Sequence, residues 1–212
     1  MTDKSLAMHP YHKNVAYYHY KGTEQPIFYY PEGIDIKALH SAYEQLDNLL
    51  TYHSRVTVVL LQFSQATQLP HNKHLTKFIA KLKKLCIEHY SIPSDRFGYA
   101  WAREEGKDGT HQHYHIAIMI NGSVCRSAYQ VFKLAKQASN EVSPFYSVSP
   151  PKRNLFLLKR SEKKRRLRTV RMRISYAFKN ATKEGVPKGV KKFGRSTIKA
   201  KPTQNTPHDH NS

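Results

Sequence analysis

The amino-acid sequence predicts an α+β fold, with a central, largely antiparallel sheet and packed helices. Short runs rich in β-branched residues alternate along the chain with longer segments of helical periodicity. Two of the short runs flank the polar loop EGKDGT, whose glycines favour a direct connection between neighbouring antiparallel strands. With 212 residues, the chain can bury one hydrophobic core and is too short for two full domains.

The same patterns predict the order of the elements. Apolar residues at helical intervals predict helices in IDIKALHSAYEQLDNLLTYH, in residues 72–90, in SAYQVFKLAKQA and around SYAFKNA. Asp35 precedes the first of these and is suited to cap its N-terminus. Strands are expected at RVTVVLLQF, FGYAWARE and HYHIAIMIN, because these apolar runs are too short for core helices.

Composition divides the chain into three parts. Residues 1–33 are rich in tyrosine, histidine and proline without a sustained period, and we expect an N-terminal arm in which VAYYHY and PIFYY can form short strands. Residues 34–196 carry the periodic segments and form the predicted domain. Residues 197–212 include TQNTPHDHNS and are expected to be a disordered tail.

The charge of the chain points to a polyanionic partner. The net charge is +20, and residues 152–201 hold most of it, with 19 lysines and arginines against two acids. A nucleic acid fits such a surplus better than a membrane surface does. KRSEKKRRLR alone could be a flexible arm, but RTVRMRISYAFKNA interleaves basic with apolar residues and predicts a folded, DNA-binding segment over 152–196. Its expected DNA contacts are Arg165, Arg166, Arg168, Arg171, Arg173 and Arg195.

Several other classes of protein are not supported by the sequence. No apolar run is long enough to cross a membrane and the amino terminus lacks the apolar region of a secretory signal, so we expect a cytoplasmic protein. Cys86 and Cys125 form no CxxC pair and are expected to be reduced. No GxxxxGK[ST] motif is present, so the chain is not expected to unwind DNA by itself.

A strand with histidines at alternate positions is the strongest chemical signal. In His111-Gln112-His113-Tyr114-His115 the three imidazoles point to one face of a strand. The preceding strand ends in Glu104 and Glu105, and a hairpin would bring this acidic pair beside the histidines. Two imidazoles and a carboxylate suit Mg²⁺ or Mn²⁺ and would also accept zinc. A one-residue shift in register would exchange which glutamate faces the histidines.

Tyr176 is the candidate nucleophile. It is followed by Lys179, so on a helix the phenol and the ammonium lie on one face, where the lysine can steady a phosphate or favour the phenolate. A YxxK string alone is usually structural, particularly in a chain with 14 tyrosines. Gln62, in the early strand, could approach the same site or be an ordinary buried or edge glutamine.

These motifs, in this order, resemble those of the HUH replication endonucleases: an acid that ends one strand, His113-Tyr114-His115 in the next, and Tyr176 with Lys179 later. More narrowly, WARE, HYHIAIMIN, ISYAFK and Phe193-Gly194-Arg195-Ser196 resemble replication-initiation proteins of filamentous phages and related prophage proteins. The resemblance covers about residues 54–197. It implies a Rep-like fold, with Glu104 preferred as the acid because it follows the arginine of the family's strand.

The resemblance also implies an activity. His113, His115 and Glu104 would hold Mg²⁺ or Mn²⁺, and Tyr176 would attack single-stranded or hairpin origin DNA, leaving a 5′-phosphotyrosine and a free 3′-hydroxyl. No second tyrosine lies one helical turn from Tyr176, which favours a single-tyrosine mechanism. The expected role is to initiate rolling-circle replication of a phage or plasmid in a bacterial cell, together with a host helicase and polymerase.

Other functions remain open at this stage. A non-catalytic, basic DNA-binding protein, such as a repressor or coating protein, could keep the histidines as a structural or vestigial metal site. A conjugative relaxase or a single-strand transposase would use the same chemistry. A cupin-like oxygenase also carries HxH strands, but the downstream carboxylate is missing and the charge of +20 suits no small substrate.

Overall fold

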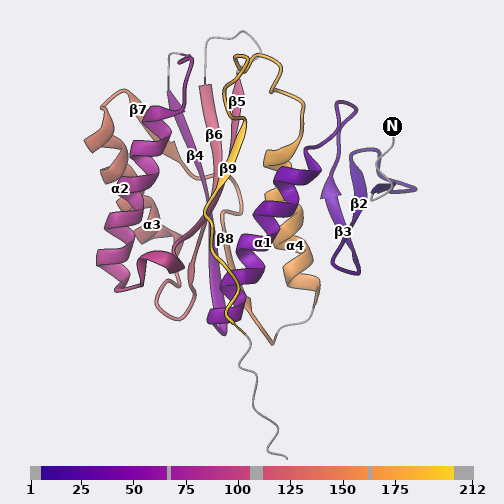
Figure 1. Ribbon diagram of the computed structural model, residues 1–212, viewed down its shortest axis with the longest axis horizontal. Helices are drawn as coiled ribbons and strands as arrows, with labels where there is room; N and C mark the ends of the chain where they lie inside the picture. Colours follow the sequence, from indigo (N-terminus) through magenta and orange to yellow (C-terminus); the bar gives the residue numbers. More distant parts are fainter. Residues whose placement is uncertain (1–5, 66–67, 106–111, 162–163, 203–212) are drawn as a thin grey trace, which may run out of the picture.

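The computed structural model describes residues 6–65, 68–105, 112–161 and 164–202. It confirms the α+β prediction, since an antiparallel six-stranded sheet lies between two layers of helices (Figure 1). The helices are α1 (Ile36–Tyr52), α2 (Lys73–Tyr90), α3 (Ala128–Val142) and α4 (Lys164–Ser175). Among the described residues, none of the helices combines the length and the apolar character that a membrane span requires.

The central sheet has the order β7-β4-β6-β5-β9, and β8 pairs with β4 beyond the end of β7. Every pair in it is antiparallel. The strands are β4 (Arg55–Gln65), β5 (Gly98–Glu105), β6 (Gln112–Asn121), β7 (Tyr146–Ser149), β8 (Leu155–Lys159) and β9 (Phe193–Arg195). Because β6 is central, its histidines have a neighbouring strand on each side.

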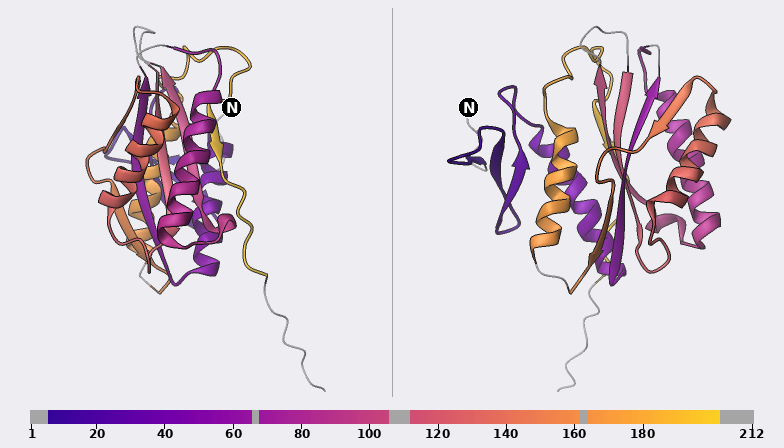
Figure 2. Two further views of the ribbon diagram at one scale, coloured as in Figure 1. Left: turned by 90° about the vertical axis from the view of Figure 1, so that its left-hand side faces the viewer. Right: turned by 180° about the vertical axis from the view of Figure 1, so that it is seen from behind.

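Both faces of the sheet are covered, and they bury different residues (Figure 2). Helices α2 and α3 cover one face, which presents Tyr114, Ile116 and Ile118 of β6. Helices α1 and α4 cover the other, against which Ala117 and Met119 pack. Since side chains alternate along a strand, His113 and His115 lie on the face of α1 and α4. Burial on both faces explains why β4 and β6 read as nearly continuous apolar runs.

The N-terminal segment forms a small sheet of its own. Strands β1 (Leu6–Met8), β2 (Val15–Tyr20) and β3 (Thr23–Phe28) pair in sequence order, and they lie outside α4, on the side away from the central sheet (Figure 1). VAYYHY is β2, and PIF lies within β3. The backbone N–H of Phe28 donates to Ser175 Oγ at 2.9 Å, which ties this sheet to the end of α4.

The structure departs from the predicted boundaries in three places. Helix α4 ends at Ser175, and Tyr176–Phe178 form a 3₁₀ turn where the late helix was expected to continue. The short strands β7, β8 and β9 were not predicted. The chain also stays packed beyond Ser196, because Ile198 is buried and its N–H donates to Gln45 Oε1 at 2.8 Å. The expected disorder of residues 203–212 lies outside the described residues.

The cap of α1 provides a test of the fold. Asp35 Oδ1 accepts a hydrogen bond from the Ala38 N–H at 2.8 Å. We expect Asp35→Ala to lower the free energy of unfolding by about 1 kcal/mol, because it leaves this N–H without its acceptor. Asp35→Asn keeps an acceptor oxygen and should lie within a few tenths of a kcal/mol of the wild type in urea denaturation. Equal losses in the two variants would contradict this account of the cap.

Candidate active site

Three side chains of the β5–β6 hairpin converge on the face of the sheet covered by α1 and α4. The ladder pairs Glu104 with His113, and His115 follows two residues later on the same face. The Nε2 atoms of His113 and His115 lie 3.1 and 3.2 Å from Glu104 Oε2. One potential ligand atom from each residue lies within 4.8 Å of the others. Two imidazole nitrogens and a carboxylate at this spacing fit a divalent cation.

The two consecutive glutamates have opposite environments. Glu104 faces the histidines, whereas Glu105 lies on the opposite face, where its Oε1 accepts from Arg103 Nε at 2.7 Å. The Arg103 side chain is fully buried and also donates to the Leu69 carbonyl at 2.6 Å. Glu105 is therefore part of a structural ion pair that fastens the segment before α2, and Glu104 is the carboxylate available to a metal.

Two lysines complete the surroundings of Glu104. Lys183 Nζ lies 3.3 Å and Lys179 Nζ 3.7 Å from Glu104 Oε1, and both lysines are buried. Burial lowers the pKa of Lys183 to about 8, against the opposing effect of the Glu104 charge. Burial alone would raise the pKa of Glu104, but hydrogen bonds from both histidines and the charge of Lys183 hold that pKa well below its ordinary value. The carboxylate is therefore ionised at neutral pH.

Lys183 was missed by the sequence reasoning. It stands in a segment that contains many lysines and arginines, and no spacing distinguishes it from its exposed neighbours. Its role follows from the fold, because the loop after Phe178 returns along the end of β5, where the Glu105 N–H donates to the Thr182 carbonyl at 3.0 Å. That contact leaves Lys183 buried beside Glu104.

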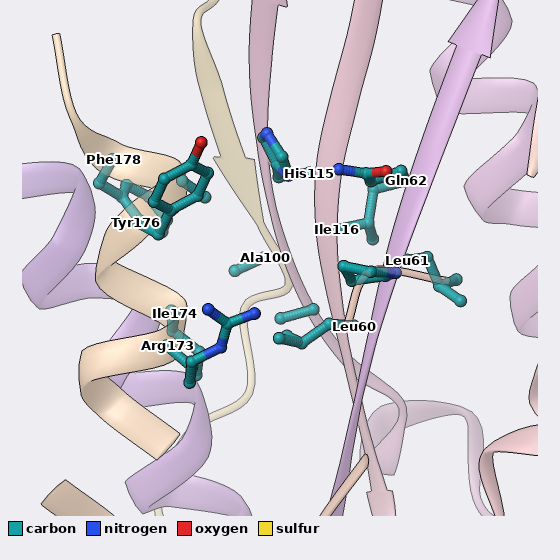
Figure 3. A pocket seen from close by; sticks show the side chains of 13 residues that line it. Leu60, Leu61, Gln62, Ala100, His115, Ile116, Arg173, Ile174, Tyr176 and Phe178 are labelled. Atoms are coloured by element: carbon teal, nitrogen blue, oxygen red, sulfur yellow. The ribbon is translucent and has the colours of Figure 1, made fainter. Parts of the chain in front are cut away.

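Tyr176 lies next to this cluster, in the 3₁₀ turn after α4. Its ring is edge-on to the His115 ring, with the centroids 5.4 Å apart and an interplanar angle of 90°. Figure 3 shows the phenol oxygen at the end of the ring that lies beside His115. Phe28 and Tyr30, from the N-terminal segment, pack around the same ring. The structure thus brings together Tyr176, His115 and, through His115, the other two candidate ligands.

Lys179 lies between the carboxylate and the phenol. Its Nζ is 4.0 Å from the centroid of the Tyr176 ring. Burial lowers the pKa of Lys179, but a hydrogen bond with the Tyr176 hydroxyl and the charge of Glu104 outweigh burial, so the net shift is upward. Although Tyr176 and Lys179 are not on one α-helix as expected, the 3₁₀ turn still brings the phenol and the ammonium together.

The structure also locates Gln62, whose role was left open. Gln62 is the cross-strand neighbour of His115 on β4, and its Oε1 accepts from Ser149 Oγ at 3.4 Å. Its amide therefore lies beside the cluster (Figure 3). His111 lies outside the described residues.

The six predicted DNA-binding arginines do not form one surface. Arg165, Arg166 and Arg168 are exposed in the first two turns of α4, and Arg195 lies on the edge strand β9, where it donates to the Ser196 carbonyl. Arg173 lies further along α4, facing the central sheet (Figure 3).

Arg171 is a correction to this prediction. It is buried, its guanidinium is paired with Asp47, and it lies 4.7 Å from the centroid of the Tyr20 ring. It therefore joins α4 to α1 and to the N-terminal sheet instead of facing a ligand.

The two glutamates allow a matched test of the metal centre. We expect Glu104→Gln to lose Mn²⁺ binding in isothermal titration calorimetry, since it replaces the only carboxylate of the described metal cluster with a weak ligand. Glu105→Gln should retain Mn²⁺ binding but lower the free energy of unfolding by about 3 kcal/mol, because it leaves Arg103 buried and without its partner charge. The opposite pattern would assign the metal ligand to Glu105.

Similarity to known proteins is found at the level of a protein family. No curated protein and no solved structure matches the chain. Residues 20–196, from the end of β2 to the residue after β9, match the family described as the YagK/YfjJ C-terminal domain. The match includes Glu104, both histidines of the metal cluster, Tyr176 and both lysines. The chain therefore belongs to the YagK/YfjJ C-terminal domain family, which is associated with prophages.

Proposed function

We propose that this protein nicks and rejoins single-stranded DNA through a covalent 5′-phosphotyrosine, and thereby initiates rolling-circle replication of a phage or plasmid. The observation that carries the proposal is the position of Tyr176, whose ring contacts His115 of the candidate metal cluster and whose ring face lies against Lys179. The order of the motifs, which resembles that of HUH endonucleases, and the prophage association of the family support it.

His113, His115 and Glu104 are the residues that would hold Mg²⁺ or Mn²⁺. A bound cation would polarise the scissile phosphodiester and offset the negative charge that develops on its non-bridging oxygens. Lys183 neutralises part of the Glu104 charge from the other carboxylate oxygen. The cluster thus offers imidazole nitrogens and one carboxylate oxygen to a cation, next to the Tyr176 ring that His115 contacts.

Tyr176 supplies the nucleophile. Its phenol oxygen forms a bond to phosphorus as the bond from phosphorus to the 3′ oxygen breaks, so the 5′ end becomes attached to the enzyme and the 3′ end is released as a hydroxyl. The phenol loses its proton and the leaving 3′ oxygen gains one. Lys179, which lies over the phenol ring, favours the phenolate electrostatically. Because the phosphotyrosine keeps the energy of the cleaved bond, reversal of the attack reseals the strand without ATP.

The basic residues of β8 and α4 provide the DNA-binding surface. Lys159, the last residue of β8, and Arg160, which follows it, are both exposed. Arg165, Arg166 and Arg168 are exposed on α4. A single-stranded or hairpin origin bound here would reach the cluster at the C-terminal end of α4. A host helicase would then unwind the duplex, and a host polymerase would extend the free 3′-hydroxyl.

A covalent adduct is the direct test of the proposed reaction. The protein is incubated with labelled single-stranded DNA that spans candidate origins, with Mn²⁺ or with EDTA, and analysed on denaturing gels. We expect a protein-linked DNA band with Mn²⁺ that is lost in Tyr176→Phe, because that variant lacks the attacking oxygen, and lost in EDTA. Tyr30→Phe is the matched control, since it removes the same atom from a neighbouring ring that also lies beside Lys179 and should keep the adduct.

The result can also favour another function. Retarded DNA without any adduct, across several substrates, would replace the nuclease by a non-catalytic DNA-binding protein. An adduct that persists in Tyr176→Phe but disappears in Tyr30→Phe would assign the nucleophile to the N-terminal segment.

The DNA-binding surface predicts a specific dependence on salt. With single-stranded DNA, each phosphate contact that is lost lowers the steepness of log affinity against log salt by about 0.7. We expect the double variant Arg165→Ala and Arg168→Ala to lower this steepness by about 1.4, measured by fluorescence anisotropy with single-stranded DNA. Asp35→Asn, which changes the N-cap of α1 and keeps all basic residues, serves as the control with an unchanged slope. A slope equal to that of the wild type would exclude both arginines from the interface.

A further inference from the structure

A cavity of about 160 Å³ lies directly beside Tyr176 and His115, between α4 and the central sheet (Figure 3). It opens next to the candidate active site and shares these two residues with it. Its base is apolar, formed mainly by Leu60, Ala117 and Ile174. Gln62 and Arg173 provide its polar groups. The cavity is therefore continuous with the place where a scissile phosphate would bind.

The register of the sheet explains why a cavity exists here. Leu60, Ala117 and Ala100 are cross-strand neighbours on β4, β6 and β5. The next row toward the end of the sheet contains Gln62 and His115. Two adjacent alanines thus stand where larger residues would fill the space under α4, immediately beyond the row that contains a candidate metal ligand.

The size and the lining of the cavity select its occupant. An apolar protein cavity of about 150 Å³ is large enough to bind benzene, so this one matches a single six-membered aromatic ring. A purine has two fused rings and exceeds that size. The apolar residues can contact the faces of such a ring, whereas a phosphate or a sugar would lose its hydration against them.

Arg173 brings its guanidinium to the lining of the cavity. Its Nη2 donates to the Lys152 carbonyl at 3.0 Å, while its Nε is buried and has no hydrogen-bond partner among the described residues. A guanidinium carries further N–H donors besides these two, and a carbonyl oxygen in the cavity can accept from one of them. Both DNA pyrimidines carry such an oxygen at C2. The amide of Gln62 adds a donor and an acceptor near the opposite wall.

We propose that this cavity binds one unstacked pyrimidine base of the single-stranded DNA, from a nucleotide adjacent to the scissile phosphate. This proposal rests on the proposed function, because it assumes that the scissile phosphate binds at the neighbouring cluster of Glu104, His113 and His115. Insertion of the base would fix the position of the strand relative to Tyr176. Phosphate contacts along α4 carry no sequence information, so this cavity would give the protein its base preference at the cleavage site.

The test measures base preference without requiring cleavage. Fluorescence anisotropy in EDTA compares oligo-dT, oligo-dA and an abasic oligomer of the same length. We expect the wild type to bind oligo-dT about tenfold more tightly than either of the others, the scale of one stacked base. Ala117→Leu fills the cavity and should bring the three affinities together, with the affinity for the abasic oligomer unchanged. Thermal unfolding followed by circular dichroism checks that the variant is folded.

Two arginine variants keep the test valid if Ala117→Leu does not fold. Arg173→Ala removes the donor in the cavity and should reduce the preference for oligo-dT. Arg168→Ala removes the same charge from an exposed position of the same helix, so it should weaken binding of all three oligomers equally.

The outcomes separate this proposal from the nuclease. A folded Ala117→Leu variant with the wild-type preference, or a wild type without preference for oligo-dT, would overturn the base-binding role even if the Tyr176 adduct forms. A preference for oligo-dA that is lost when Ala117→Leu fills the cavity would also overturn the proposal, because the occupant would then be a purine. A preference for oligo-dT that Ala117→Leu abolishes would support it even if no adduct is found.

Discussion

The candidate site depends on one buried carboxylate. Glu104 accepts from His113 and His115 through one oxygen and lies against Lys179 and Lys183 through the other. These four partners come from β6, from the end of the 3₁₀ turn and from the loop that follows it. A buried negative charge is tolerated only when several partners compensate it, so the same interactions that keep Glu104 ionised also hold the Tyr176 turn against the sheet.

The position of Tyr176 is secured from the other side as well. Arg171 joins α4 to Asp47 of α1 and packs on the Tyr20 ring, and Ser175 accepts from the Phe28 backbone. The N-terminal segment, expected to be an arm, is therefore a layer of the fold that supports α4 from outside. A single basic helix thus has two roles, since its buried arginine positions the helix and its exposed arginines are available to DNA.

Much of this organisation could be predicted from the sequence. Periodicity was sufficient for α1, α2, α3 and the three long strands, because each of them buries a continuous face, and alternation placed His113 and His115 together. Spacing alone could not decide between Glu104 and Glu105, since that choice depends on the hairpin register. Lys183 and the burial of Arg171 were beyond prediction, because both residues lie in a strongly basic segment where only tertiary contacts distinguish buried from exposed residues. The cavity was likewise beyond prediction, since alanines from separate strands become neighbours only in the folded sheet.

The short outer strands of the sheet have a consequence for how the protein behaves at high concentration. At one edge, β9 has only 3 residues. The opposite edge is shared by β7, with 4 residues, and β8, with 5 residues, which pair with different halves of β4. Long, flat edges offer rows of free backbone groups to other chains and promote aggregation, whereas short edges present few such groups in line. The division of one edge between two strands therefore protects the long apolar strand β4 from intermolecular pairing along its whole length.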